Sequence, residues 1–197
     1  MRFLFLSLKG GVGKTSLAIN LATYLGIQCV TTDLIISENS NAAQIAPNKK
    51  RIPLQHTAKK DIVFDFGAMS TNIDPKVAQA VKLSNAIVIP TLTDARSLQG
   101  TIDTFNLVKE AGKPTIIVIN NFTNESKFNN AKDYLIEALG QLTILSIRTT
   151  TLFERVAKDG SEWFSNVHHN KGEYQLNKSR RNHEQVYDVI VALGSKK

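Results

Sequence analysis

Residues 8–16 read Leu-Lys-Gly-Gly-Val-Gly-Lys-Thr-Ser and stand between the apolar run 3–6 and the helix-like stretch 16–25. This order of strand, glycine-rich loop and helix is what a phosphate-binding loop requires. Glycines permit turns that point backbone N–H groups at phosphate oxygens, and the positive end of the helix dipole favours the same anion. Lys14 adds a full charge for the terminal phosphates, and the Thr15 hydroxyl suits Mg²⁺. The predicted nucleoside triphosphate site consists of Gly10, Gly11, Val12, Gly13, Lys14, Thr15 and Ser16.

The length and composition are those of an ordinary α/β domain. The 197 residues are expected to form a single domain, 1–197, which buries about 70% of the unfolded surface. No run of 18 or more apolar residues is present, so we expect neither a signal peptide nor a membrane span. The single cysteine, Cys29, lies in an apolar segment and fits a reducing compartment. We therefore expect a cytoplasmic protein.

The charge balance is basic, with 24 Lys and Arg against 17 Asp and Glu, a net charge of +7 and a pI of about 9.5. The basic residues concentrate in 48–51, 59–60 and 171–181. Such an excess favours a polyanionic partner, of which nucleic acid is the commonest for a soluble chain. A basic balance can also serve solubility alone, so charge by itself leaves both readings open.

Short apolar runs alternate with segments of helical length, which predicts a doubly wound, mostly parallel β-sheet with helices on both faces. The expected strands are 2–7, 28–32, 61–66, 86–90, 115–120 and 142–147. The expected helices are 14–25, 74–83, 95–111, 127–139, 151–158 and 182–193. Two polar stretches, 35–60 and 165–178, are expected to be surface excursions with little regular structure. Their composition suits contact with a phosphate backbone and equally suits a solvated loop.

One position departs from the general phosphate-loop pattern G-x-x-x-x-G-K-[ST], because Leu8 replaces the first glycine and Lys9 follows it. Lys14 already supplies the lysine that the phosphate-binding loop of one chain needs, so Lys9 has no role in binding the phosphates of its own chain. Here the sequence resembles the deviant Walker A ATPases, the family of the ParA and MinD proteins, whose loop reads K-G-G-x-G-K-[ST]. The resemblance is greatest to small ParA-type plasmid partition ATPases. It implies that Lys9 reaches across an ATP-bound homodimer to the phosphates of the partner, whereas a solvated charge at a loop edge is the alternative.

Two acidic residues complete the site that this resemblance implies. Asp65 ends the apolar run 62–65 and is followed by Phe66-Gly67, which is similar to the Walker B pattern of the family and assigns Asp65 to Mg²⁺. Asp33 matches the later aspartate of the Asp-x-Asp-Pro-Gln motif, which positions the attacking water. Thr31 stands at the place of the earlier aspartate, and Pro-Gln is absent. We therefore expect hydrolysis of ATP to be slow and stimulated by a partner, unless Asp33 only caps a turn.

The choice of base follows from the end of another predicted strand. Relatives place an asparagine there against the adenine edge, and Asn120 occupies this position. The Asn-Lys-x-Asp motif of GTP-binding proteins is not matched by residues 120–123. The resemblance therefore implies ATP, with Mg²⁺, as the ligand. Asparagine is also common at such junctions for local reasons.

The resemblance covers most of the chain in order, and residues 35–60 and 165–180 match poorly. Small ParA proteins expose basic residues to DNA after the last predicted strand, in a segment similar to 147–163. This similarity and the basic stretch before the last helix give the candidates for DNA binding as Arg148, Arg155, Lys158, Lys178, Arg180 and Arg181. Charges on a solvated helix surface are the alternative.

The resemblance implies a ParA-type ATPase that binds DNA without sequence preference as an ATP-bound homodimer, associates with the nucleoid and responds to a ParB-like, DNA-bound adaptor. A MinD-like membrane-associated ATPase is an alternative, but the terminal segment 186–197 lacks the aromatic and basic residues of an interfacial anchor. An accessory ATPase for conjugation or plasmid maintenance is another. One cysteine cannot supply the cluster ligands of a nitrogenase-type reductase.

Overall fold

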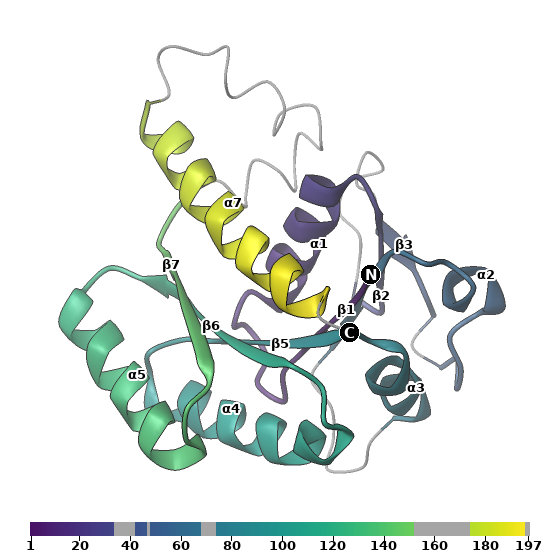
Figure 1. The fold of residues 1–197 in the computed structure, drawn as a ribbon, viewed down its shortest axis with the longest axis horizontal. Coiled ribbons are helices and arrows are strands. Elements are labelled where there is room, and N and C mark those ends of the chain that lie inside the picture. Colours follow the sequence, from purple (N-terminus) through teal and green to yellow (C-terminus); the bar gives the residue numbers. More distant parts are fainter. Residues whose placement is uncertain (34–41, 47, 68–73, 152–173, 196–197) are drawn as a thin grey trace.

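The computed structural model describes residues 1–33, 42–46, 48–67, 74–151 and 174–195. Within them, seven strands form one sheet in the order β3-β2-β4-β1-β5-β6-β7, and every pairing is parallel. Helices cover both faces of this sheet (Figure 1). The predicted doubly wound α/β architecture is therefore confirmed, with a sheet that is parallel throughout the described residues.

The strands are β1 (Arg2–Leu6), β2 (Gln28–Thr31), β3 (Ala42–Gln44), β4 (Ile62–Phe66), β5 (Ala86–Thr91), β6 (Thr115–Phe122) and β7 (Thr143–Arg148). The helices are α1 (Lys14–Leu25), α2 (Leu54–Thr57), α3 (Pro75–Leu83), α4 (Ala95–Val108), the 3₁₀ helix η1 (Lys109–Ala111), α5 (Glu125–Leu139) and α7 (Tyr174–Gly194). Capping side chains start three of the helices, because Asp74, Asp94 and Asn124 each accept a backbone N–H from the first turn.

The central strand shows why the apolar runs are nearly continuous. Phe3 and Phe5 of β1 pack into the core on one face of the sheet, Leu4 and Leu6 pack into the core on the other, and all four are fully buried. Alternate side chains of a strand point to opposite faces, so a strand covered on both sides needs apolar residues at every position. The continuous apolar run of β1 is therefore explained by a hydrophobic core on each face of the sheet.

Three helices close the first core and two close the second. The first receives residues of α3, α4 and α5, namely Val77, Ala80, Leu98, Val108, Ala131 and Leu135. The second receives residues of α1 and α7, namely Leu17, Ala18, Leu21, Ala22, Val186, Tyr187 and Ile190. Cys29 lies in the second core, where burial raises the pKa of its thiol well above the usual value. This cysteine is a packing residue.

Residues 35–60 were expected to have little regular structure, and two short elements lie among the described residues of this stretch. Residues 42–44 form the edge strand β3, which pairs with β2 through Cys29 and Ala42, and residues 54–57 form the short helix α2 after Pro53. Ala-Ala-Gln contains no β-branched or aromatic residue, so the segment gives no strand signal. The extended conformation of this segment is therefore stabilised by its pairing with β2 and not by its own sequence.

The last helix begins at Tyr174, eight residues before the predicted start at Asn182, so the expectation of an irregular segment through residue 178 was wrong. Arg180 and His183 occupy the buried face of this helix, one turn before the apolar positions Val186 and Tyr187. An amphipathic helix is recognised in a sequence by apolar residues at helical spacing, and here polar residues occupy buried positions of that spacing, so the first turns of the helix were not predicted. The predicted helix 151–158 lies outside the described residues, apart from residue 151.

The two chain ends lie at the edge of the sheet where the strands begin (Figure 1). The hydroxyl of Ser195 donates a hydrogen bond to Sδ of Met1 at 2.9 Å, and the Met1 ammonium pairs with Asp61, just before β4. A Cβ on Gly194 would lie 2.6 Å from a ring carbon of Phe3. Helix α7 therefore ends at the amino edge of the sheet and begins near its carboxyl edge.

Among the described residues, no helix is long and apolar enough to span a membrane.

The buried Tyr187 gives a test of this packing. Its side chain is 1% exposed and contacts the rings of Tyr24 and His183, yet its hydroxyl has no hydrogen-bond partner in the described structure. Tyr187→Phe should therefore keep or raise the free energy of unfolding, since it removes an unpaired buried polar group. Tyr187→Ala should lower it by about 3–5 kcal/mol through the cavity it leaves. Urea unfolding of both variants, with Tyr134→Phe as an exposed control, measures this; a loss above ~1 kcal/mol in Tyr187→Phe would contradict it.

Candidate functional site

The predicted phosphate loop connects the central strand β1 to α1, at the carboxyl edge of the sheet. Parallel α/β sheets bind ligands at this edge. Gly13 precedes α1 with φ of 82°, and Gly11 has φ of 79°, a left-handed conformation that favours glycine. A Cβ on Gly13 would also lie 2.3 Å from Nδ2 of Asn120. The loop therefore needs glycine at Gly13 both for its backbone angle and for the close approach of β6.

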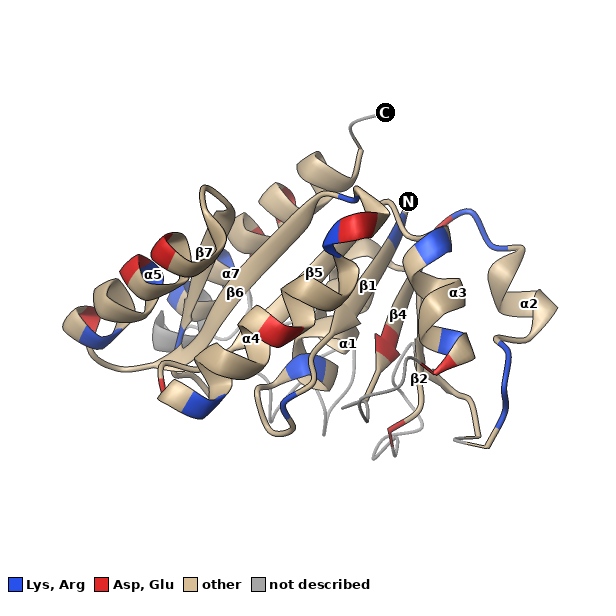
Figure 2. Cartoon of the chain, turned by 90° about the horizontal axis from the view of Figure 1, so that it is seen from below, with Lys and Arg blue, Asp and Glu red and all other residues tan. Residues whose placement is uncertain are grey.

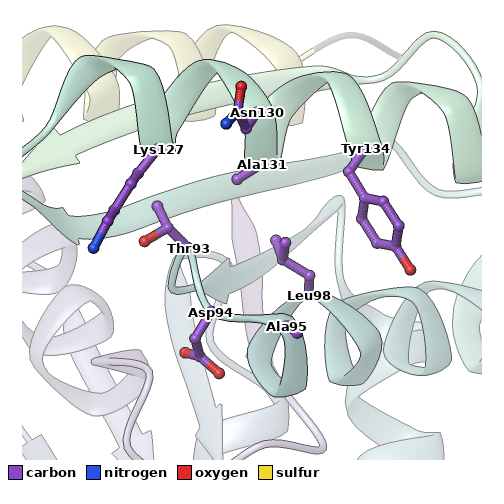
Figure 3. A pocket seen from close by; sticks show the side chains of 8 residues that line it. All are labelled: Thr93, Asp94, Ala95, Leu98, Lys127, Asn130, Ala131 and Tyr134. Atoms are coloured by element: carbon purple, nitrogen blue, oxygen red, sulfur yellow. The ribbon is translucent and has the colours of Figure 1, made fainter.

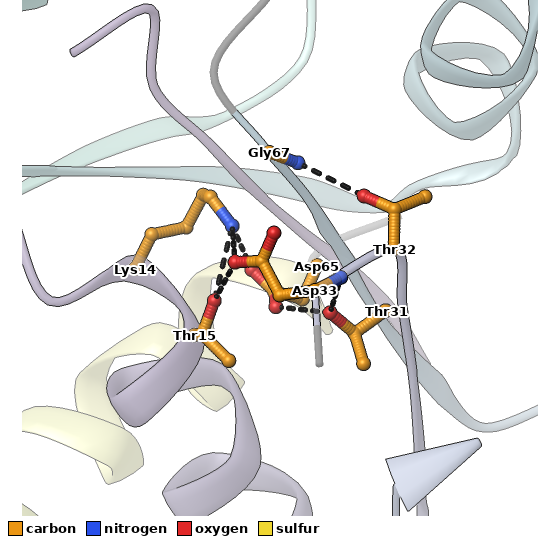
Figure 4. A network of polar contacts seen from close by, with 7 residues as sticks. All are labelled: Lys14, Thr15, Thr31, Thr32, Asp33, Asp65 and Gly67. Atoms are coloured by element: carbon orange, nitrogen blue, oxygen red, sulfur yellow. Dashed lines mark hydrogen bonds and ion pairs between the residues drawn. The ribbon is translucent and has the colours of Figure 1, made fainter. Parts of the chain in front are cut away.

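A buried ion pair stands behind the loop. The ammonium of Lys14 pairs with Asp65, and these side chains are 8% and 0% exposed (Figure 4). The other carboxylate oxygen of Asp65 accepts a hydrogen bond from the hydroxyl of Thr31 at 2.7 Å. Thr31 and Asp65 are register partners on β2 and β4, so the sheet itself places the hydroxyl beside the carboxylate. Both oxygens of the buried acid thus have partners, as a buried charge requires.

Asp33 lies on the open side of the same network. Its Oδ2 accepts a hydrogen bond from the hydroxyl of Thr15 at 2.6 Å and lies 3.5 Å from Nζ of Lys14. The carboxylate is 47% exposed, and the backbone N–H of Asp33 donates to the Thr31 hydroxyl at 3.0 Å. The structure therefore gathers Lys14, Thr15, Asp33 and Asp65 from three separate segments, as Figure 4 shows.

The donor atoms around Thr15 match the chemistry of Mg²⁺. The hydroxyl of Thr15 and the carboxylates of Asp33 and Asp65 are hard oxygen donors in one network with Lys14. Mg²⁺ prefers oxygen ligands and binds one or two protein groups together with water and phosphate oxygens. The residues present therefore fit a magnesium ion held by Thr15 and one of the acids.

The loop that follows Asp65 touches the Asp33 segment. The backbone N–H of Gly67 donates to the Thr32 hydroxyl at 3.3 Å, and a Cβ on Gly67 would lie 3.2 Å from Oδ1 of Asp33. Glycine therefore lets the two strand ends approach each other. A displacement of either segment would therefore change the position of the Asp33 carboxylate.

A cavity of about 200 Å³ lies beside the loop, on the side of β6. It is lined by Gly11, Gly13, Ser16, Leu92, Asn120, Asn121, Arg148 and Thr150. Asn120 is 4% exposed and donates from Nδ2 to the carbonyl of Val12 at 3.2 Å, while its Oδ1 has no hydrogen-bond partner among the described residues. A buried acceptor without a partner costs free energy unless a ligand supplies the donor. The adjoining cavity therefore fits a planar polar group with an amino donor.

A larger cavity, of about 490 Å³, lies apart from the loop between α4 and α5 (Figure 3). Its walls include Leu98, Ala131 and Tyr134, and Asp94 and Lys127 stand at its rim. None of the residues predicted for the site lines this cavity. The smaller cavity, which adjoins the phosphate loop, is therefore the better candidate for the nucleotide.

The basic candidates are placed in different surroundings. Lys178 and Arg181 are exposed on the first half of α7, on the side of the carboxyl edge. Arg180 is 5% exposed and pairs with Glu184 at 3.1 Å, so it does not offer a free cation at the surface. Arg148 pairs with Glu125, stacks on the ring of Phe122 at 5.5 Å and lines the small cavity. Arg155 and Lys158 lie outside the described residues.

Some residues of the site were not found by sequence reasoning. Thr31 entered only as the replacement for an acid, whereas it donates to Asp65. Its register partnership with Asp65 is set by the pairing of β2 with β4, which the sequence does not show. Thr104 of α4 also went unnoticed, although its hydroxyl accepts the backbone N–H of Leu8 at 3.0 Å. Contacts between segments almost a hundred residues apart have no local signature.

Comparison with known proteins gives a consistent result. Residues 3–162 match the family model described as the CobQ/CobB/MinD/ParA nucleotide binding domain. Among solved structures, the ATP complex of an McdA variant from Cyanothece is 16% identical, with a TM-score of 0.67 and coverage of 100% of this chain and 97% of that one. MinD from Pyrococcus horikoshii with Mg-ADP is 14% identical, with a TM-score of 0.65 and coverage of 100% and 99%.

A ParA family ATPase from Chlorobium tepidum is 18% identical, with a TM-score of 0.59 and coverage of 91% of this chain and 96% of that one. No curated protein matches the chain significantly. At these identities, the structural similarity shows the shared fold.

The two acids that face Lys14 should differ in their effect on stability. Asp65→Ala leaves the buried ammonium with its hydrogen bond to the Thr15 hydroxyl and only the 3.5 Å ion pair with Asp33, so we expect a loss of about 3–5 kcal/mol in the free energy of unfolding. Asp33→Ala removes a half-exposed carboxylate and should cost about 0–1 kcal/mol. Urea unfolding without nucleotide compares the two variants. Equal losses would mean that the Lys14–Asp65 pair is not the main electrostatic support of this site.

Proposed function

Because the chain belongs to the CobQ/CobB/MinD/ParA nucleotide binding domain family, we propose that it is a ParA-type ATPase in which ATP switches the affinity for DNA. Two ATP-bound copies form a dimer, and each Lys9 reaches the phosphates held by the other copy. The dimer binds DNA without sequence preference and associates with the nucleoid in the cytoplasm. Hydrolysis, stimulated by a ParB-like adaptor on DNA, opens the dimer and releases it. The switch serves partition or the positioning of a cargo.

The observation that carries this proposal is the pair of lysines on one loop with different surroundings. Lys14 is buried and bonded within the network of Asp65, Thr15 and Asp33. Lys9 is exposed, and its ammonium donates only to the carbonyl of Gly10, at 3.2 Å, among the described residues. A single site has no need of the second cation. A second phosphate group, bound to another copy, is the partner that fits it.

In the proposed reaction, the chain exchanges one set of contacts for another. Lys14 would exchange its contact with Asp65 for the phosphates, and the freed carboxylate together with the Thr15 hydroxyl would hold Mg²⁺. Bound Mg²⁺ supplies charge neutralisation at the phosphates. Asp33, half-exposed beside Thr15, orients the attacking water. Gly67 lies so close that a Cβ there would stand 3.2 Å from Oδ1 of Asp33, which places the end of β4 to respond to the terminal phosphate, as switch loops do.

ATP fits the small cavity better than GTP. The unpaired Oδ1 of Asn120 is an acceptor for the 6-amino group of adenine, whereas guanine presents a carbonyl oxygen at that position. Two acceptors facing each other would leave both unpaired, and such a mismatch discriminates strongly in a buried site. Arg148, which lines the cavity, is proposed to act at the nucleotide side, so the DNA contact is proposed to rest on Lys178 and Arg181, with Arg155 and Lys158.

The role of Lys9 can be tested by comparing three lysine variants. Lys14→Ala should reduce ATP binding by 100-fold or more, which corresponds to roughly 3 kcal/mol for a charge-assisted contact. Lys9→Ala should change the ATP affinity of the monomer by less than about threefold and abolish ATP-dependent dimerisation, since its phosphate partner belongs to the other copy. Lys82→Ala, an exposed lysine on α3, is the control. Fluorescent ATP titration and analytical ultracentrifugation give the two readouts.

A Lys9→Ala protein that still forms dimers with ATP and Mg²⁺ would remove the proposed role of this residue. A Lys14→Ala protein that binds ATP normally would overturn the assignment of the phosphate loop as well. The first outcome alone leaves a nucleotide-binding protein without the proposed switch.

DNA binding should depend on ATP and fall steeply with salt, because phosphate contacts release counterions. Replacing Lys178 and Arg181 with Ala removes four cations from a dimer, so the magnitude of the slope of log affinity against log salt should decrease by about 3.6, at about 0.9 per lost phosphate contact. The matched control is the Lys59→Ala, Lys60→Ala variant, which changes the charge equally at the amino edge of the sheet, beside α2 (Figure 2). Fluorescence anisotropy with two unrelated duplexes gives the slopes. A change only in the control variant would place DNA on the opposite edge.

A further inference from the structure

Helix α4 contacts Lys9 and binds the backbone of Leu8 just before it, and we propose that Gly100 and Thr104 are the positioning residues that direct this lysine toward a second copy of the chain. The inference rests on the proposed role of Lys9. Neither residue belongs to the nucleotide-binding loop, and neither touches Lys14, Asp33 or Asp65 in the described contacts.

At Gly100, α4 lies so close to Lys9 that an added Cβ would require Lys9 to shift by a few tenths of an ångström. A Cβ there would lie 3.0 Å from Cβ of Lys9 and 3.7 Å from its backbone nitrogen. Glycine inside a helix lowers helix stability relative to alanine, so its presence in the middle of α4 has a cost that the contact with Lys9 explains. The helix axis can approach the loop this closely only because the position has no Cβ.

Thr104 fixes the same segment through hydrogen bonds. Its hydroxyl accepts the backbone N–H of Leu8 at 3.0 Å and donates to the carbonyl of Gly100 at 2.5 Å, and the side chain is fully buried. On the other side of Leu8, the hydroxyl of Ser7 accepts the backbone N–H of Lys9 at 3.2 Å. Two successive backbone N–H groups are therefore bound by side-chain hydroxyls, so they do not turn toward the phosphate cradle.

The arrangement gives Leu8 and Lys9 a different task from the glycines that follow. The segment is held against α4, which is itself anchored by Leu98 and Val108 in the first core and capped by Asp94. Lys9 then leaves the loop on its exposed side, while Lys14 stays buried. The rigid helix thus keeps Lys9, the cation proposed for the second copy, apart from Lys14, the cation proposed for the chain's own ligand. A pre-positioned cation loses less conformational entropy when the dimer closes.

The test measures ATP affinity of the monomer and ATP-dependent dimerisation separately. Gly100→Ala should leave fluorescent-ATP affinity within twofold and weaken dimerisation at least tenfold, because the added methyl displaces the Lys9 backbone. Thr104→Val, which is nearly isosteric but lacks the acceptor, should also weaken dimerisation, and Thr104→Ser should restore it. Asn106→Ala, on the exposed side of α4, is the control for a general change in the helix.

A double-mutant cycle separates positioning from a structural role. The cycle uses Lys9→Arg, which keeps a cation and so leaves dimerisation measurable; in this background Gly100→Ala should weaken dimerisation less than it does in the unchanged chain, since the lysine that it positions is gone. If Lys9→Ala abolishes dimerisation and Gly100→Ala does not weaken it, the inference about α4 is overturned and the role of Lys9 stands. Additive effects in the double variant, or failure of Thr104→Ser to restore dimerisation, would likewise contradict positioning. Normal dimerisation of Lys9→Ala itself would overturn the proposed function.

Discussion

The ion pair between Lys14 and Asp65 is the constraint around which the carboxyl edge of the sheet is organised. It joins the start of α1 to the end of β4, and Thr31 of β2 completes the shell of the buried carboxylate. A lone charge at this depth would be very unfavourable, so each member of the pair requires the other. The residues of the site therefore neutralise one another, and a phosphate that approaches Lys14 must compete with the carboxylate of Asp65.

The same constraint explains why the fold and the site depend on each other. Asp65 reaches Lys14 only because β4 lies beside β1 in register, and Thr31 reaches Asp65 only because β2 lies on the other side of β4. The order of the parallel strands thus fixes the chemistry of the pocket. Helix α4 adds the last support, since it binds the backbone of Leu8 from the opposite face of the sheet.

The sequence predicted the parts of the molecule that local pattern determines. The glycine loop, α1 and the buried strands follow from spacing, capping and apolar runs, and their predicted bounds agree with the structure within about two residues. Strand β3 and the first turns of α7 were missed because tertiary contacts decide them: β3 pairs with an existing strand, and Arg180 lies on a buried helix face. In the site, Lys14 and Asp65 could be predicted because each stands in a local sequence motif. The hydroxyls of Thr31 and Thr104 could not, because their partners are brought to them only by the fold.

The adjacency of Met1 and Ser195 at the amino edge has a practical consequence for labelling. A fluorophore or affinity handle attached near either end starts from the side of the sheet farthest from the phosphate loop. Joining the ends through a short linker and reopening the chain at an exposed turn is also geometrically feasible, since neighbouring termini favour circular permutation. Such rearranged chains would present the nucleotide edge unobstructed to a surface or a second molecule.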